Sequence, residues 1–262
     1  MKILDLFSRI RRFFCRPSSV VSGGFSEDFP SWEIAKTHSK GWADNVIFDR
    51  VKAAAHLLHE GKVVYERDSV VFEETQYSWG LLAGFLYSAI GNDKIDVVDF
   101  GGAFGSTFFQ NRKFFAKCKV SWNIIEQPHV VEYGRKCFCH GPVHFFFSLS
   151  EALSCVKPQV IIFSSVLPYI ENPYKVLAEA VAAKIPVIIV DRTSFHLGSG
   201  DRIKIQRVPK EIYLSSFPIR FFEKKAFLNR LEEKYELMAS FPSIDLSPSP
   251  DLAFEGMIWR LK

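Results

Sequence analysis

The sequence lacks the short motifs that most often mark a metal site or a disulfide framework. Its 262 residues include five cysteines and seven histidines, but no CxxC pair and no HExxH motif. Zinc sites commonly use those two spacings, so we expect no metal. An odd number of scattered cysteines is typical of reduced thiols and predicts a cytoplasmic protein without disulfide bonds.

The chain also lacks a strong excess of either charge. Its 33 Lys and Arg residues and 29 Asp and Glu residues leave a formal net charge of +4. Beyond the extreme N-terminus, no basic tract is interleaved with aromatic residues. Proteins that bind nucleic acid usually carry such a tract, so we expect no nucleic-acid partner.

The N-terminus has no apolar run long enough to cross a membrane. Residues 1–16 instead place apolar residues near helical spacing, with basic residues between them. The segment is too short and too charged to span a bilayer, and its apolar stretch is interrupted too soon for a secretion signal. Two interpretations stay open: a basic amphipathic helix lying on an anionic membrane surface, and a helix docked on the protein itself. With the serine- and glycine-rich stretch that follows, residues 1–24 form a predicted leader and linker.

Residues 95–109 are the most informative part of the sequence. A β-branched apolar run ends in Asp99, and Gly101, Gly102 and Gly105 follow before a second apolar run. This order predicts a buried strand, a glycine turn and the N-terminus of a helix. Glycine has no side chain and tolerates positive φ, so a ligand can approach the backbone of such a turn closely.

The spacing of these glycines narrows the choice of cofactor. A dinucleotide fingerprint reads G-x-G-x-x-G, but Ala103 and Ser106 occupy its second and third glycine positions when counted from Gly101. A phosphate loop of the ATPase kind needs a lysine after its last glycine, and Gly105 is followed by Ser106 and Thr107. The spacing argues against both, although a nucleotide-sugar enzyme that uses NAD stays an alternative.

The turn resembles the first motif of the class I S-adenosylmethionine (SAM)-dependent methyltransferases, an acid-x-Gly-Gly-x-x-Gly turn after the first strand. Asp99, Gly101, Gly102 and Gly105 fill its positions. The resemblance implies that SAM is the cofactor and that the glycines make room for its methionine part. Asp99 would receive the ammonium group, directly or through water.

A second acid comes at the matching distance. Residues 120–128 predict a strand that ends in Glu126, where an acid usually holds a nucleotide ribose. A carboxylate can accept hydrogen bonds from both ribose hydroxyls. We therefore expect Glu126 and its neighbour Gln127 to contact SAM, together with Ser148 and Ser164 at the ends of the next two strands.

The remainder of the chain alternates apolar runs with helix-compatible segments. Strands are expected at residues 143–148, 160–167 and 186–193, and a helix with Pro173 at its first position follows Asn172. Continuous apolar runs of this kind favour a parallel sheet covered on both faces. The fold class is therefore α/β.

The methyltransferase resemblance implies the finer architecture. It predicts a Rossmann-like class I methyltransferase fold, with a seven-stranded, mostly parallel sheet, a terminal antiparallel hairpin and an N-terminal helical extension. Residues 25–92 would form the helical cap and residues 93–262 the methyltransferase domain.

Longer segments are similar to a little-characterised bacterial family of methyltransferases that is often associated with surface-polysaccharide gene clusters. These segments are DFGGAFGSTFFQNR, WNIIEQP, SSVLPYIENPY, VDRTSF and VPKEIYLSSFPIRFF. The family does not supply the substrate. Our hypothesis is an O-methyltransferase of a saccharide or glycan precursor, whose oligomeric state the sequence does not reveal. An N- or C-methyltransferase of another small metabolite and a catalytically silent scaffold remain alternatives.

A hydroxyl acceptor needs a base to take its proton. Asp191 and His196 are the candidates, with Tyr169 as a positioning hydroxyl. Alternatively, Asp191 pairs with Arg192 or Arg202 and His196 is an exposed loop residue.

Two further segments lie where a ligand would bind. The polar connection at residues 66–68 either touches the ligand or is solvated. Residues 242–250, between the two terminal strands, form either a substrate lid or a disordered proline-rich loop.

Overall fold

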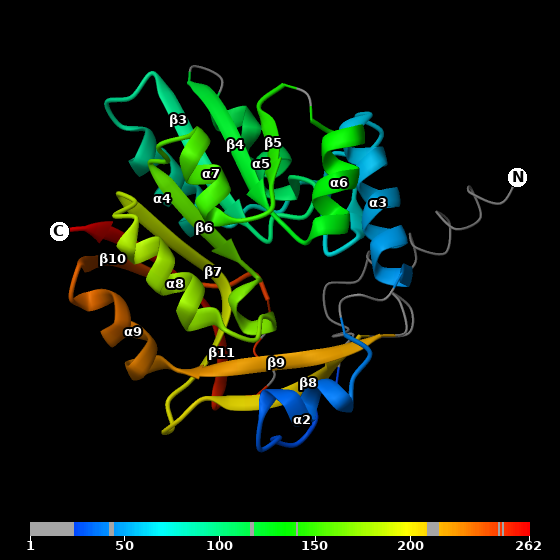
Figure 1. The fold of residues 1–262 in the computed structure, drawn as a ribbon, viewed down its shortest axis with the longest axis vertical. Coiled ribbons are helices and arrows are strands. Elements are labelled where there is room, and N and C mark those ends of the chain that lie inside the picture. The colour runs from blue at the N-terminus through cyan, green and yellow to red at the C-terminus, as the bar shows by residue number, and fades with distance from the viewer. Residues whose placement is uncertain are drawn as a thin grey trace, which may run out of the picture.

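A computed structural model of the protein describes residues 24–41, 45–115, 118–139, 141–208, 215–245, 247 and 249–262 (Figure 1). The predicted amphipathic helix of residues 1–16 lies outside these ranges. Within them, every helix is too short or too polar to pass through a bilayer.

A mixed sheet of nine strands forms the centre of the molecule. Its main strands are β3 (Lys94–Phe100), β4 (Lys119–Ile125), β5 (Val143–Phe146), β6 (Val160–Ser164), β7 (Val187–His196), β10 (Tyr235–Pro242) and β11 (Leu252–Leu261). The strands lie in the order β5-β4-β3-β6-β7-β11-β10, and the first five are parallel. β11 pairs antiparallel with β7 and with β10. The predicted mostly parallel sheet with a terminal antiparallel hairpin is confirmed.

The parallel strands are buried on both faces, as their continuous apolar runs predict. Adjacent residues such as Val97 and Val98 contribute to two separate hydrophobic clusters, one on each face. One face is covered by α4 (Trp79–Ala89), α5 (Ser106–Asn111) and α6 (Pro128–Cys137), and the other by α7 (Leu149–Cys155), α8 (Pro173–Ala182) and α9 (Lys224–Glu232). The helix predicted to begin at Pro173 after Asn172 is confirmed as α8.

Two strands that the sequence did not indicate extend this sheet. β8 (Arg202–Arg207) and β9 (Ser216–Glu223) form an antiparallel hairpin between β7 and α9, and the end of β9 pairs in parallel with the end of β7. The helix α2 (Trp32–Thr37) packs against β8, with Trp32 and Ala35 clustered on Ile203 and Ile205. In Figure 1, β8, β9 and α2 lie below the main sheet.

A second, small hairpin precedes α4. Its strands β1 (Tyr65–Arg67) and β2 (Val70–Phe72) follow α3 (Asn45–His59) and pair antiparallel. Asp68 and Ser69 form the turn, with left-handed φ values of 52° and 67°. This is the backbone that a two-residue hairpin turn requires. The predicted polar connection is therefore an ordered hairpin.

Candidate active site

The turn after β3 is built on left-handed backbone. Gly101 has a φ of 73° and Gly105 a φ of 95°, and Ala103 between them has a φ of 48°. The Gly101 N–H donates to the Ile125 carbonyl over 2.8 Å, which ties the turn to the end of β4. A Cβ on Gly101 would lie 2.4 Å from Cγ2 of Val166, in the loop after β6. Only glycine fits between that loop and this turn.

Asp99 lies beneath the turn and is 1% exposed. The Trp122 indole N–H donates to its Oδ2 over 2.9 Å. A Cβ on Gly102 would lie 2.5 Å from Asp99 Cγ, so this glycine makes room for the carboxylate. Burial raises the pKa of Asp99 to about 7; the Trp122 hydrogen bond opposes the rise and the negative charge of Glu126 adds to it.

Glu126 directly follows the neighbouring strand, β4, and contacts the turn. Its Oε1 accepts the Ala103 N–H over 3.2 Å, and its Oε2 accepts the Gln127 N–H over 2.8 Å. Burial raises the pKa of Glu126, and both N–H groups oppose that rise. Each carboxylate oxygen has two lone-pair sites, so these bonds leave acceptor capacity on both oxygens.

A third carboxylate reaches the turn from the N-terminal part of the chain. Glu66 on β1 is 4% exposed and accepts the hydroxyl of Ser106, the first residue of α5. It also accepts the Ser69 N–H over 2.8 Å. Burial raises the pKa of Glu66 to about 7, and both hydrogen bonds oppose that rise. The sequence gives no local signal for this contact, because Glu66 and Ser106 are 40 residues apart.

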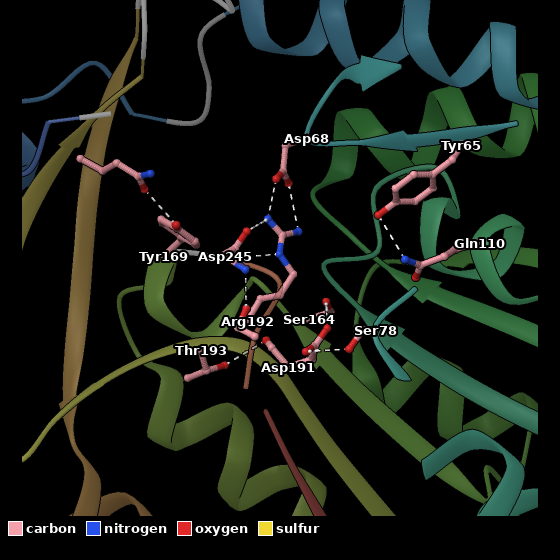
Figure 2. Close-up of polar contacts among 12 residues, drawn as sticks. Tyr65, Asp68, Ser78, Gln110, Ser164, Tyr169, Asp191, Arg192, Thr193 and Asp245 are labelled. Carbon is pink, nitrogen blue, oxygen red and sulfur yellow. Dashed lines mark hydrogen bonds and ion pairs between the residues drawn. The ribbon is translucent and has the colours of Figure 1, made fainter. Parts of the chain in front are cut away.

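The end of β6 and the middle of β7, which pair at Ser164 and Asp191, form a second polar group (Figure 2). Asp191 is 1% exposed and accepts the hydroxyls of Ser164, over 3.2 Å, and Ser78, over 3.4 Å. Burial raises the pKa of Asp191 to about 6, while the positive charge of Arg192 lowers it. Its carbonyl accepts the N–H of Ser165 over 3.0 Å.

Arg192 lies between two carboxylates that are far apart in the sequence. Its Nη2 is 2.5 Å from Oδ2 of Asp68, in the β1–β2 turn, and its Nε is 2.7 Å from Oδ2 of Asp245. Asp245 belongs to the loop of residues 242–250, so this part of that loop reaches the rim of the site. Asp191 is therefore hydrogen-bonded to two serines, and Arg192 pairs with Asp68 and Asp245 in place of Asp191.

Backbone strain gathers around these two groups of residues. Among the described residues, the non-glycine positions with left-handed φ are Asp68, Ser69, Ala103, Ser165, Lys184 and Arg192. All except Lys184 belong to the glycine turn, the β1–β2 turn, the loop after β6 or the neighbouring part of β7. Such conformations cost free energy and are concentrated at functional sites.

Of the other predicted site residues, two have structural partners and a third is exposed. The Ser148 hydroxyl accepts the Glu151 N–H over 3.1 Å and caps α7. The Tyr169 hydroxyl donates to Oε1 of Gln206 on β8 over 2.9 Å. Gln127 is exposed, at the N-cap of α6.

His196 ends β7, away from the glycine turn. One ring nitrogen, Nε2, is 2.7 Å from the Gly200 carbonyl, and the other, Nδ1, accepts the Gly198 N–H over 3.1 Å. The ring lines a groove of about 490 Å³ together with Arg202, Lys224 and Glu255, and no residue of the glycine turn lines it. The structure thus brings together Asp99, the three glycines and Glu126, and separately Ser164 and Asp191, but it does not bring His196 to either group.

The described ranges contain no group of three His, Cys, Asp or Glu side chains that is arranged to hold a metal ion. The chemistry available at the two polar groups is that of carboxylates, hydroxyls and backbone N–H groups.

No protein family's sequence profile matches the chain, and no curated protein matches it in sequence. Among solved structures, the N-terminal domain of EvdMO1 with SAH bound has a TM-score of 0.50, with 12% identity over 82% of this chain and 96% of that one. The same domain in the presence of SAH and D-fucose has a TM-score of 0.49, with 12% identity over 85% and 98% of the two chains. An S-adenosylmethionine-dependent methyltransferase from Clostridium acetobutylicum ATCC 824 has a TM-score of 0.45, with 8% identity over 71% and 92%. At such identity, the likeness to the first of these shows a shared Rossmann-like fold and nothing about the reaction.

Proposed function

We propose that this chain is a SAM-dependent methyltransferase. The observation that carries the proposal is the pair of carboxylates, Asp99 and Glu126, that both adjoin a left-handed glycine turn. Their chemistry distinguishes between classes of cofactor. Glu126 already accepts the Ala103 N–H that a phosphate loop would offer to its ligand, and buried acids repel a phosphate.

A cationic ligand fits this group of acids. Asp99, Glu126 and Glu66 all have raised pKa values because burial disfavours their charged forms. An ammonium or sulfonium group placed among them would favour ionisation, since opposite charges attract strongly where water is excluded. Glu126 has lone pairs left for two ribose hydroxyls, and Asp99 has further lone pairs for an ammonium group.

The acceptor would meet the cofactor at the end of β6, beside Asp191 of β7. When bound, SAM supplies a methyl group on a positively charged sulfur. The residues of this chain hold an acceptor hydroxyl in line with that methyl group and take its proton. Asp191 is the proposed base, with Ser164 between it and the site, because its pKa of about 6 lies near a working pH.

A saccharide or glycan precursor is the acceptor we propose. The choice follows the gene context of the family that the sequence segments resemble, and not a known substrate of that family. Hydroxyl and carboxylate groups at the end of β6 and on the neighbouring part of β7, among them Ser164 and Asp191, suit a ligand with several hydroxyls. Free cysteines at Cys118, Cys137, Cys139 and Cys155 suit action in a reducing compartment such as the cytoplasm.

Calorimetry with S-adenosylhomocysteine, beside NAD⁺ as a comparison ligand, tests the cofactor. We expect the first to bind and the second not to bind. A chain that binds neither would favour the scaffold alternative, and binding of NAD⁺ alone would overturn the proposal.

The acceptor is tested by transfer from a labelled methyl donor to envelope precursors, followed by identification of the methylated atom. Label on oxygen of a saccharide is the expected product. Label on nitrogen or carbon would leave the methyltransferase proposal standing and overturn the proposed saccharide hydroxyl as the acceptor.

A further inference from the structure

The β1–β2 hairpin touches both halves of the site through neighbouring residues. Glu66 on β1 accepts the Ser106 hydroxyl beside the glycine turn. Asp68, in the turn of the same hairpin, pairs with Arg192 in the middle of β7. Figure 2 shows Asp68 pointing toward Arg192 from the hairpin above it. One short hairpin therefore connects the cofactor side of the site to the acceptor side.

The hairpin depends on these contacts for its position. Each strand has three residues, and an isolated hairpin of this size is not stable in water. On the side of α5, the buried Tyr65 accepts a hydrogen bond on its hydroxyl from Nε2 of Gln110 over 3.2 Å, next to the Glu66–Ser106 contact. On the side of β7, the described contact is the ion pair between Asp68 and Arg192.

Arg192 is well suited to hold a carboxylate in place. Its side chain is 11% exposed and its planar guanidinium contacts both oxygens of Asp68, with the second contact, Nη1 to Oδ1, at 3.3 Å. Asp245 binds the other edge of the same guanidinium. The backbone of Arg192 has a φ of 52°, at the point where the register between β7 and β11 shifts. A strained position of this kind persists only where its surroundings fix it.

We infer that Arg192 is a positioning residue for cofactor binding: through Asp68 it holds the β1–β2 hairpin, and with it Glu66, against the first turn of α5. The inference rests on the proposed function, because it assumes that the ligand binds at the glycine turn. It links the part of the site around Asp191, where the acceptor would bind, to the glycine turn, where the cofactor would bind. Loss of the Arg192–Asp68 pair therefore weakens cofactor binding, although neither residue contacts the glycine turn.

The two carboxylates on Arg192 provide a matched pair of variants. Asp68→Asn removes the charge on the hairpin, and asparagine tolerates the left-handed backbone of that turn. Asp245→Asn removes the other charge and leaves the hairpin contact intact. Each variant leaves Arg192 with one carboxylate, so neither leaves a buried charge without a partner.

Calorimetry with S-adenosylhomocysteine, together with hydrogen exchange of residues 65–72, tests the inference. We expect Asp68→Asn to weaken binding about fivefold or more, as a coupling between sites does, and to speed exchange of the hairpin. Asp245→Asn should keep wild-type affinity and wild-type exchange in the hairpin. Arg192→Lys, which keeps the charge but lacks the planar fork, should behave like Asp68→Asn.

A double-mutant cycle separates this link from a general loss of stability. If Asp68 and Ser106 act through the same hairpin, the effects of Asp68→Asn and Ser106→Ala on affinity are not additive. Equal losses in Asp68→Asn and Asp245→Asn, or wild-type affinity in Asp68→Asn, would overturn the inference and leave the proposed function standing. A wild-type chain that does not bind S-adenosylhomocysteine overturns both.

Discussion

Glu126 accepts the backbone N–H of Ala103 over 3.2 Å, so the acid at the end of β4 holds the turn that follows β3. The same carboxylate accepts the N–H of Gln127, at the start of α6, over 2.8 Å. One side chain thus joins the turn after β3 to the start of α6. Under the proposed function, its remaining lone pairs accept hydrogen bonds from the ligand's hydroxyl groups.

Substitution of Glu126 by alanine should weaken binding of S-adenosylhomocysteine by about 1 to 3 kcal/mol, the cost of leaving buried polar groups without partners. Calorimetry measures the loss. Glu132 on α6 is exposed, so Glu132→Ala is the matched control and should bind like the wild type. Equal affinities in the two variants would exclude Glu126 from the ligand site.

Alanine variants of Gly101 and Gly61 distinguish the cost of backbone strain from the cost of crowding. Both have left-handed φ, 73° and 70°, but a Cβ on Gly61 would meet nothing within 4 Å, whereas one on Gly101 would meet Val166. Gly61→Ala should cost about 1 to 2 kcal/mol of unfolding free energy, the strain of a left-handed alanine. Gly101→Ala should cost a further ~1 to 3 kcal/mol from overpacking. Urea unfolding of the two variants measures the difference.

Val166→Ala in the Gly101→Ala background tests the cause of that difference. It should recover only part of the extra cost, because the Val166 Cβ would still lie 2.9 Å from the added Cβ. The same unfolding free energy for Gly61→Ala and Gly101→Ala would show that the loop after β6 does not press on the turn.

Much of the sheet could be predicted from the sequence, because its strands are continuous apolar runs buried on both faces. β8 and β9 were missed because charged residues interrupt them: Arg202, Lys204 and Arg207 in one and Arg220 in the other. Three of these charges, on Arg202, Lys204 and Arg220, are met by carboxylates elsewhere in the chain. Lys204, for example, is 7% exposed and pairs with Asp28 over 2.9 Å.

The candidate site likewise has one part that the sequence predicts and another that it does not. Asp99, the glycines and Glu126 follow one another within a single strand-turn-helix-strand unit, so their order along the chain indicates their proximity. Arg192 lies 124 residues from Asp68 and 53 from Asp245, and no periodicity connects residues so far apart. The sequence offered Asp191 as a partner for Arg192, whereas the structure pairs Arg192 with carboxylates from two loops.

Asp99 should make the stability of the ligand-free chain depend on pH. Its pKa is about 7 in the folded chain and 3.8 ordinarily, so between these values the folded state holds a proton that the unfolded state has lost. The contribution of Asp99 to the unfolding free energy is therefore present in full below its ordinary pKa. It falls as the pH rises toward about 7.

Asp99→Asn cannot ionise, so its unfolding free energy should decline less steeply over this range than that of the wild type. Chemical unfolding at a series of pH values measures both slopes. Affinity for the ammonium-bearing S-adenosylhomocysteine should change in the opposite direction and increase as Asp99 ionises. Parallel slopes for variant and wild type would show that Asp99 is already charged in the folded chain.

Asp191 and His196, the two bases that the sequence offers, differ in what surrounds them. Asp191 binds Ser164 at the tip of β6, while both ring nitrogens of His196 are engaged by the turn that follows β7. Asp191→Asn should therefore slow methyl transfer about 10²- to 10⁴-fold, as loss of a general base does, with little change in affinity for S-adenosylhomocysteine. His196→Gln should keep the transfer rate and lower the melting temperature, since it removes hydrogen bonds between a buried side chain and the turn that follows β7. Single-turnover transfer of a labelled methyl group measures the rates; a folded His196→Gln variant without transfer, beside an active Asp191→Asn variant, would reverse the assignment of the base.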